Sequence, residues 1–314
     1  MYRESVCVIG GGGFVGRHLI SRLAAQGRQV RVASRRREGA KHLLVLPGVR
    51  VDELDVHDET VLTDWAAGAD AVVNLAGILH GTPQVFEKVH VELPAKLVAA
   101  CRRQGVGRLL HMSALGADPE ARSVYQQSKG RGEELVREAG LNDLATTIFR
   151  PSVIFGPGDS FLNLFAGLLK LAPVVPLAGA SAHFQPVFVG DVARAFADSL
   201  DDPGCFGQTY NLCGPRVYTL AQLVRMAGRA VGRAPGVIPL NETLSFWFAA
   251  AMELKPGRKI MTRDNHYSML TDNFCPDGFP ARFGSATGLE SVIGYLNEEN
   301  PRTGYDLFRR RARR

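Results

Sequence analysis

Residues 6–16 read V-C-V-I-G-G-G-G-F-V-G, a short apolar run that leads straight into four glycines and then into a helical pattern. Gly10, Gly13 and Gly16 give the spacing G-x-x-G-x-x-G. A glycine-rich turn between a strand and a helix lets the backbone approach a pyrophosphate, to which the helix N-terminus offers unpaired N–H groups. The stretch predicts a dinucleotide-binding turn, with a purely structural turn as the alternative. The residues expected to hold the dinucleotide here are Gly10, Gly13, Phe14, Val15 and Gly16.

The pattern around this turn repeats along the first 150 residues, where short β-branched runs alternate with amphipathic stretches. Repeated strand–helix–strand units form a parallel sheet with right-handed crossovers. Strands are expected at 5–9, 29–33, 49–54, 71–75, 108–112 and 145–149, and helices at 14–25, 85–104 and 124–139. The fold class is therefore α/β, a Rossmann doubly wound parallel sheet.

The rhythm changes after residue 149, where four prolines fall within one short interval. Residues 1–155 are expected to form the dinucleotide-binding domain, and 156–183 with 213–300 a smaller, interleaved substrate-side region. Residues 185–200 again indicate a strand and a helix, with Asp191 as the helix N-cap, so 184–212 should return to the first domain. Residues 301–314 form a basic tail.

The cysteines are odd in number and show neither a C-x-x-C pair nor zinc-ligand spacing. We therefore expect reduced thiols, no metal site and a cytoplasmic location for a chain whose first residues show no signal-peptide pattern. The five cysteines are Cys7, Cys101, Cys205, Cys213 and Cys275.

The net charge of the chain is +6, but arginines in the last six residues carry most of it, which leaves the body nearly neutral. This distribution argues against a nucleic-acid partner and confines electrostatic docking to the tail. The tail could bind the inner face of a membrane or an acidic protein of a redox complex, or be a solvated terminus. The apolar stretch 243–254 is too short to span a membrane and predicts a buried or partner-facing helix.

The second strand ends without the acid that would bind the ribose hydroxyls of NAD. Ser34, Arg35 and Arg36 stand there instead, and arginine can bind a 2′-phosphate with paired donors. NADP(H) is therefore the favoured cofactor, with NAD(H) and a merely exposed basic turn as alternatives.

Tyr125 and Lys129 form Y-x-x-x-K on a predicted helix, and Ser113 ends the strand before it. Residues four apart lie on the same helix face, so the ammonium of Lys129 should favour the phenolate of Tyr125 and bring its pKa toward neutral pH. Tyr125 would then exchange a proton with a small carbonyl or secondary alcohol that Ser113 polarises. In the alternative interpretation, Tyr125 and Lys129 only bind cofactor or pack.

Together with Asn74–Gly77, these residues resemble the short-chain dehydrogenase/reductase superfamily, and 150–158 and 188–193 resemble its extended, epimerase/dehydratase-like branch. The resemblance implies an adenine site, a nicotinamide-ribose site and a segment that closes over the nicotinamide. The residues so implied are Asp55 and Val56 for the first, Leu75, Ala76 and Gly77 with Tyr125 and Lys129 for the second, and Pro151 and Val153 for the third.

Segments 111–117, 161–163, 185–187 and 262–265 resemble more narrowly the atypical subgroup that contains the dinucleotide-binding accessory subunit of respiratory complex I. That likeness implies a second hypothesis beside the NADP(H)-dependent oxidoreductase, namely a nucleotide-holding accessory or assembly protein of a membrane redox complex. A nucleotide-sugar epimerase or dehydratase is less favoured, because Ser113 and Tyr125 are too close in sequence for the insertion common in those enzymes.

Overall fold

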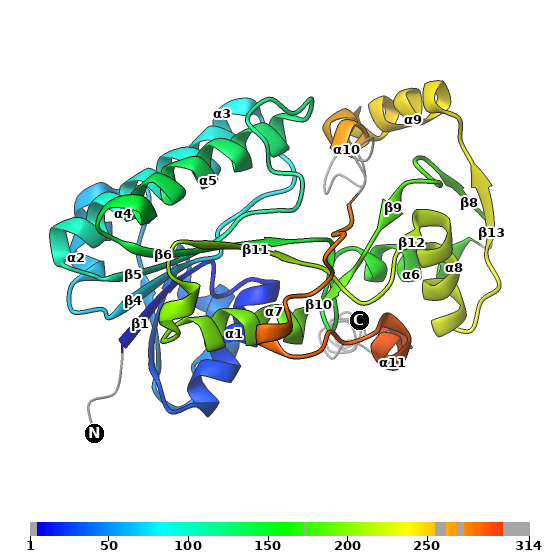
Figure 1. Cartoon of the computed structure of the whole chain (residues 1–314). Helices are drawn as coiled ribbons and strands as arrows, with labels where there is room; N and C mark the ends of the chain where they lie inside the picture. The colour runs from blue at the N-terminus through cyan, green and yellow to red at the C-terminus, as the bar shows by residue number, and fades with distance from the viewer. Residues whose placement is uncertain (1–4, 173, 255–261, 269–272, 298–314) are drawn as a thin grey trace, which may run out of the picture.

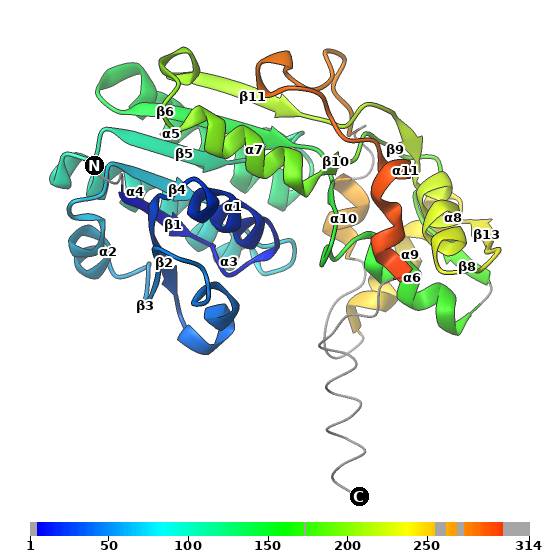
Figure 2. The same cartoon turned by 90° about the horizontal axis from the view of Figure 1, so that it is seen from below.

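The computed structural model describes residues 5–172, 174–254, 262–268 and 273–297. Its main sheet has seven parallel strands in the order β11-β6-β5-β4-β1-β2-β3 (Figure 2). They are β1 (Ser5–Ile9), β2 (Gln29–Ser34), β3 (Val49–Glu53), β4 (Ala71–Asn74), β5 (Arg108–Met112), β6 (Ala145–Pro151) and β11 (Gln208–Leu212). The order reverses beside β1, where doubly wound sheets bind their ligands, and the predicted Rossmann class is confirmed.

Helices cover both faces of this sheet (Figure 1). Along β1, Val6 and Val8 face one hydrophobic core, while Cys7 and Ile9 face the other. Both faces of a parallel sheet are buried in this way, which explains the nearly continuous apolar run that precedes the glycines. The first face carries α1 (Phe14–Ala25) and α7 (Val189–Ser199), and the second carries α2 (Glu59–Ala66), α4 (Leu93–Gln104) and α5 (Val124–Asn142).

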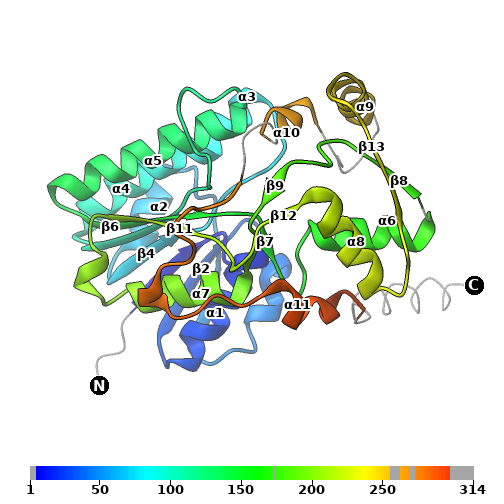
Figure 3. The ribbon, with the colours of Figure 1, turned by 45° about the vertical axis from the view of Figure 1, so that its right-hand side comes forward.

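A smaller region lies beyond the carboxyl ends of the strands and has its own core around Phe155, Leu162 and Leu223 (Figure 3). Three two-stranded pairs belong to it, namely β7 (Ile154–Phe155) with β10 (Val187–Phe188), β8 (Val174–Leu177) with β13 (Gly236–Pro239), and β9 (His183–Phe184) with β12 (Tyr218–Thr219). Its helices are α6 (Leu162–Leu171), α8 (Leu220–Ala230), α9 (Glu242–Leu254), α10 (Arg263–Ser268) and α11 (Leu289–Val292).

Two local expectations differ from the structure. The helix expected over 85–104 begins at Pro83 and contains a π-helical turn, Lys88–Glu92, between α3 (Pro83–Glu87) and α4. Asp191 is not the N-cap of α7, which is Phe188. The Asp191 carboxylate is buried and instead accepts hydrogen bonds from Thr287 N (2.6 Å) and Thr287 Oγ1 (3.1 Å). It therefore anchors the segment around Thr287 to α7.

The expectation of five free thiols is wrong for one pair, because Cys213 and Cys275 form a disulfide. Cys213 follows β11, and the two residues lie 62 positions apart. The Gln185 side chain brings them together, since its Nε2 donates to Gly214 O (2.6 Å) and its Oε1 accepts from Cys275 N (2.8 Å). The expected cytoplasmic location depended on reduced thiols, and this pair does not support it. Cys7, Cys101 and Cys205 are free and buried.

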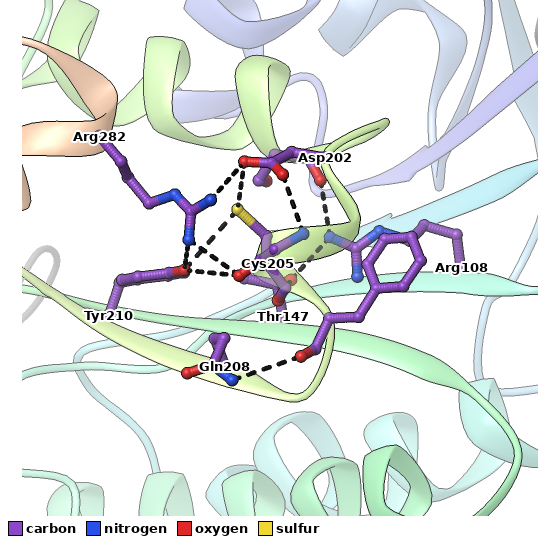
Figure 4. A network of polar contacts seen from close by, with 10 residues as sticks. Arg108, Thr147, Asp202, Cys205, Gln208, Tyr210 and Arg282 are labelled. Carbon is purple, nitrogen blue, oxygen red and sulfur yellow. Dashed lines mark hydrogen bonds and ion pairs between the residues drawn. The ribbon is translucent and has the colours of Figure 1, made fainter.

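A polar network, buried around Arg108 and Thr147, joins β5, β6 and β11 near their amino ends (Figure 4). This is the opposite end of the sheet from the glycine turn. The Arg108 guanidinium donates to Ser199 O (2.7 Å), Leu200 O (3.2 Å), Ala145 O (2.8 Å) and Thr147 Oγ1 (2.6 Å). Charge-assisted bonds to four acceptors compensate for the burial of the cation. The network therefore holds α7 and the edge of the sheet in register, away from the candidate site. No helix that the structure describes is both long and apolar enough to cross a membrane.

Candidate functional site

The glycine turn places two glycines, Gly10 and Gly16, where a side chain would not fit. Gly10 has a φ of +78°, and a Cβ there would lie 2.8 Å from the carbonyl carbon of Leu75. A Cβ at Gly16 would lie 2.4 Å from Gly11 O. Gly13 is the N-cap of α1, and no side chain caps this helix. The turn thus leaves the N-terminal N–H groups of α1 open to an anionic ligand, as a bound pyrophosphate requires.

Phe14 and Val15, which follow Gly13, differ in what they could offer a dinucleotide. The Val15 side chain packs in the core below α1, so only its backbone N–H could contact a ligand. Phe14 is half-buried, and its ring lies 5.8 Å from that of His18.

The arginines after β2 are exposed at the edge of this turn. The Ser34 hydroxyl donates to Arg36 O (2.8 Å) and accepts from Arg36 N (3.4 Å), which fixes the bend. Neither Arg35 nor Arg36 forms an ion pair with any residue that the structure describes. Two guanidinium groups are thus available to a phosphate near the end of β2.

Asp55 and Val56 follow β3 along the same edge. The His57 N–H donates to Asp55 Oδ1 (3.0 Å) and, as the largest contribution, lowers the pKa of this exposed carboxyl. Val56 is half-buried against the core beneath it. A hollow of about 600 Å³ lies nearby at β3. In its wall, Asp52 forms ion pairs with Arg31 and Arg50. Its charges therefore largely neutralise one another.

The loop after β4 lies against the Y-x-x-x-K helix. Ala76 N donates to Asn74 Oδ1 (3.1 Å), which turns the chain away from the buried Leu75. A Cβ on Gly77 would lie 3.8 Å from His90 Nε2 and 3.9 Å from Lys129 Nζ. The absence of a side chain at Gly77 therefore keeps the space above Lys129 open.

Lys129 joins α5 to the strand end that carries Ser113, because its ammonium donates to Met112 O (2.7 Å). The Ser113 hydroxyl is buried and has no hydrogen-bond partner among the described residues. A buried hydroxyl without a partner is costly and suits a site that a substrate oxygen completes. The structure thus brings Ser113 and Lys129 to one place, with Tyr125 one turn before Lys129 on α5.

The expected lowering of the Tyr125 pKa is not what the structure gives. Burial and then the Asp264 carboxylate raise the pKa of Tyr125 to about 12. Burial, opposed by Glu133, lowers the pKa of Lys129 to about 8. Desolvation and Asp264 thus outweigh the ammonium, and the phenol stays protonated at neutral pH.

His90, which the sequence reading missed, connects these groups from the π-helical turn. Its Nε2 accepts from Ile78 N (3.1 Å), so the proton of the neutral ring is assigned to Nδ1, which donates to Ser128 Oγ (2.9 Å). The ring also packs edge-on against that of Tyr125, with centroids 5.6 Å apart. Burial and then Lys129 lower the pKa of His90 to about 3. π-helical turns are frequent at functional sites, but nothing in the local sequence marks this one.

Asp264 is a second residue to which the sequence analysis gave no role. Its carboxylate accepts from Ser123 Oγ (2.9 Å), Val124 N (2.7 Å) and Tyr125 N (3.2 Å), so the smaller region caps the start of α5. A carboxylate at a helix N-terminus is stabilised by the helix dipole. The motif over 262–265 was visible in the sequence, but its contact with residues 140 positions away was not.

Pro151 and Val153 lie where β6 passes into the smaller region. Pro151 is buried, and Asn273 Oδ1 accepts from Ser152 Oγ (2.5 Å) and from Val153 N (3.2 Å). The segment thus lies at the carboxyl edge of the sheet, with the end of β11 beside it, since Ser152 N donates to Leu212 O (2.9 Å).

Fold and site together define a Rossmann-fold, dinucleotide-binding protein of the short-chain dehydrogenase/reductase type. The chain belongs to the NAD dependent epimerase/dehydratase family, whose model matches residues 6–213.

Among similar proteins is the mitochondrial NADH-ubiquinone oxidoreductase 40 kDa subunit of Neurospora crassa, 32% identical over 232 residues, covering 73% of this chain and 60% of the subunit. The chain thus spans less than two thirds of that subunit. The mouse mitochondrial NADH dehydrogenase [ubiquinone] 1 alpha subcomplex subunit 9 is 30% identical, covering 87% of this chain and 73% of the subunit. The ceramide reductase of Caulobacter vibrioides is 27% identical, covering 93% of this chain and 94% of the reductase.

Solved structures share the fold. That of gox2253 is 20% identical with a TM-score of 0.73, covering 94% of this chain and 97% of its own. That of MoeE5 in complex with UDP-glucose and NAD is 19% identical with a TM-score of 0.72, covering 95% of this chain and 99% of its own.

Proposed function

We propose that the chain is an NADP(H)-dependent oxidoreductase that reduces a small carbonyl compound through Ser113, Tyr125 and Lys129. The observation that carries the proposal is the buried hydroxyl of Ser113, which lacks a partner among the described residues and lies next to the anchor of Lys129. A substrate carbonyl oxygen would satisfy that hydroxyl. A bound nicotinamide would supply the hydride.

The protonation states favour the reductive direction. A Tyr125 pKa near 12 keeps the phenol protonated at neutral pH, ready to give its proton to the developing alkoxide. Lys129, with a pKa of about 8, is mostly charged at neutral pH and stabilises the phenolate that is left behind. Two similar proteins are named as reductases, the ceramide reductase and the 2-alkyl-3-oxoalkanoate reductase of Stenotrophomonas maltophilia.

The preference for NADP(H) depends on Arg35 and Arg36, whose guanidinium groups have no ion-pair partner among the described residues. Replacing both by serine should weaken NADPH binding by about tenfold or more, because a hydrogen bond between charged groups contributes about 1.5–3 kcal/mol. NADH affinity should change little. Fluorescence titration with both nucleotides measures this, and an equal loss for both would refute the 2′-phosphate assignment.

The catalytic proposal is tested with Tyr125→Phe. Consumption of NADPH with a panel of aliphatic ketones and 3-oxo esters should fall by at least about 100-fold, since general acid catalysis contributes about 10²–10⁴. The affinity of this variant for NADPH should be close to that of the wild type. Tyr210→Phe, which alters a tyrosine in the Arg282 network at the other end of the sheet, is the matched control. Unchanged turnover in Tyr125→Phe would refute the assignment.

A second function is a nucleotide-holding accessory protein of a membrane redox complex. It is favoured by the likeness to the mitochondrial subunits and by the exposure of Leu244 and Trp247 on α9. The arginine tail, also part of this hypothesis, lies outside the described residues. Under this function the nucleotide stays bound through purification without turnover, and the protein sediments with membranes at low salt. A protein that stays in the supernatant and turns over NADPH would refute it.

A further inference from the structure

A pocket of about 300 Å³ lies against the first turn of α5, where α3, α9 and α10 meet. Its lining combines apolar and aromatic residues, among them Phe86, Val124, Phe246 and Tyr267, with four charged residues. Phe86 also packs edge-on against the ring of Tyr125, with centroids 6.1 Å apart. The pocket therefore shares a wall with the phenol of the proposed reaction.

The acidic groups of this pocket already have partners. Asp264 accepts from Ser123 Oγ and from the backbone at Val124 and Tyr125. Glu253 accepts from Arg263 Nε (2.9 Å) and thereby also neutralises that cation. Neither carboxylate is thus left without a counterpart to hold a basic ligand.

Arg122 is the exception among the charged residues of the lining. It is exposed, and no residue that the structure describes lies within ion-pair distance of it. It stands three residues before Tyr125, at the entrance to α5. A cation without a counter-ion beside an aromatic pocket is complementary to a ligand with an apolar chain and an acidic group.

The surroundings of the pocket are also apolar. Val85 on α3 and Leu244 and Trp247 on α9 are exposed large hydrophobic residues on elements that line it. A ligand chain longer than the pocket would continue over Val85, which lies next to Gly81 of the lining.

We propose that this pocket binds the chain of a single-chain aliphatic acid, with its carboxylate at Arg122 and its chain against Phe86 and Phe246. The inference rests on the proposed function in one respect, since it makes the substrate an oxo acid of this class with its carbonyl at Tyr125.

The test uses calorimetry of the full chain with decanoate, hexanoate and 1-decanol, each with NADPH present and absent. Decanoate binds more tightly than hexanoate, by about fourfold for each methylene that the pocket covers. Decanoate also binds about fivefold more tightly than 1-decanol, the gain expected for one exposed ion pair. Equal affinity for the acid and the alcohol, or no binding of decanoate at millimolar concentration, overturns the proposal.

Variants separate the two parts of the site. Arg122→Gln removes the difference between decanoate and 1-decanol, whereas Arg225→Gln, a matched change of an exposed arginine on α8, leaves it intact. Phe246→Ser weakens both ligands by about tenfold. Equal effects of the two arginine changes, or unchanged binding in Phe246→Ser, contradict the assignment. Thermal melting of each variant identifies loss of folding.

The outcome stays distinguishable from that of the proposed function. If decanoate binds with these variant effects but Tyr125→Phe leaves turnover unchanged, the ligand proposed for the pocket is supported and the catalytic role of Tyr125 is refuted. If NADPH-dependent reduction depends on Tyr125 but decanoate does not bind, only the ligand proposed for the pocket is refuted.

Discussion

The buried His90 should make the stability of the protein fall as the pH falls through the range of an ordinary histidine. Its Nε2 accepts from Ile78 N, and Lys129 is close enough to disfavour a second positive charge. Burial and then Lys129 lower the pKa of His90 to about 3 from its ordinary value of 6.5. Protonation in the folded state would also break the hydrogen bond from Ile78 N. Between these two values the unfolded chain binds the proton and the folded chain does not.

The sign follows from linkage: unfolding takes up a proton below about pH 6.5, so acid favours the unfolded state. At about 1.36 kcal/mol per pH unit for one proton, this group lowers the free energy of unfolding by about 2 kcal/mol between about pH 7.5 and about pH 5. The stability is fully present above pH 6.5 and is lost progressively down to about pH 3.

The assay is urea unfolding of the wild type and His90→Gln at both pH values. His90→Gln loses stability at either pH, but its pH-dependent loss should be about 2 kcal/mol smaller than that of the wild type. His111, also buried with a lowered pKa, is common to both proteins and cancels. His183→Gln changes an exposed histidine and serves as the control. Parallel pH dependence in the wild type and His90→Gln would refute the reasoning.

Three further predictions concern α5 and its partners. Glu133→Gln should lower the free energy of unfolding by about 3–5 kcal/mol, measured in urea, because Arg150 Nε donates to a carboxylate that is only 1% exposed; a loss below about 1 kcal/mol would contradict a buried ion pair. Asp264→Asn should lower the pKa of Tyr125, read as the phenolate absorbance that Tyr125→Phe removes, and an unchanged pKa would mean that burial alone sets it. NADPH-dependent reduction should decline as the pH rises through about 8, where Lys129 loses its proton, and a rate that is flat to pH 10 would exclude that role.

Local patterns were sufficient for most of the nucleotide-binding half. β5 and α1 have the bounds expected from periodicity, and the glycine turn lies between β1 and α1 as predicted. These features depend on contacts between residues close in sequence, which a repeating apolar pattern records. The π-helical turn within the helix expected over 85–104 leaves that pattern almost unchanged and was missed.

Long-range contacts account for what the sequence could not show. The capping of α5 by Asp264 and the disulfide of Cys213 join positions that come together only when the smaller region folds over the sheet edge. The grouping of Ser113 with Lys129 was expected from spacing, but the pKa of Tyr125 depends on burial and on a distant carboxylate. The catalytic roles of these residues and the domain boundaries stay predictions.

The disulfide between Cys213 and Cys275 makes the thermal stability of this protein depend on whether its surroundings oxidise or reduce thiols. Closing a loop of 62 positions removes conformational freedom from the unfolded chain and contributes up to about 4 kcal/mol in the loop-entropy model. The hydrogen bonds of Gln185 and Asn273 do not involve the sulfur atoms and would still hold the same segment after reduction. A thiol reductant would therefore leave the fold in place but lower its melting temperature. The same polypeptide would then have one melting temperature when oxidised and a lower one when reduced.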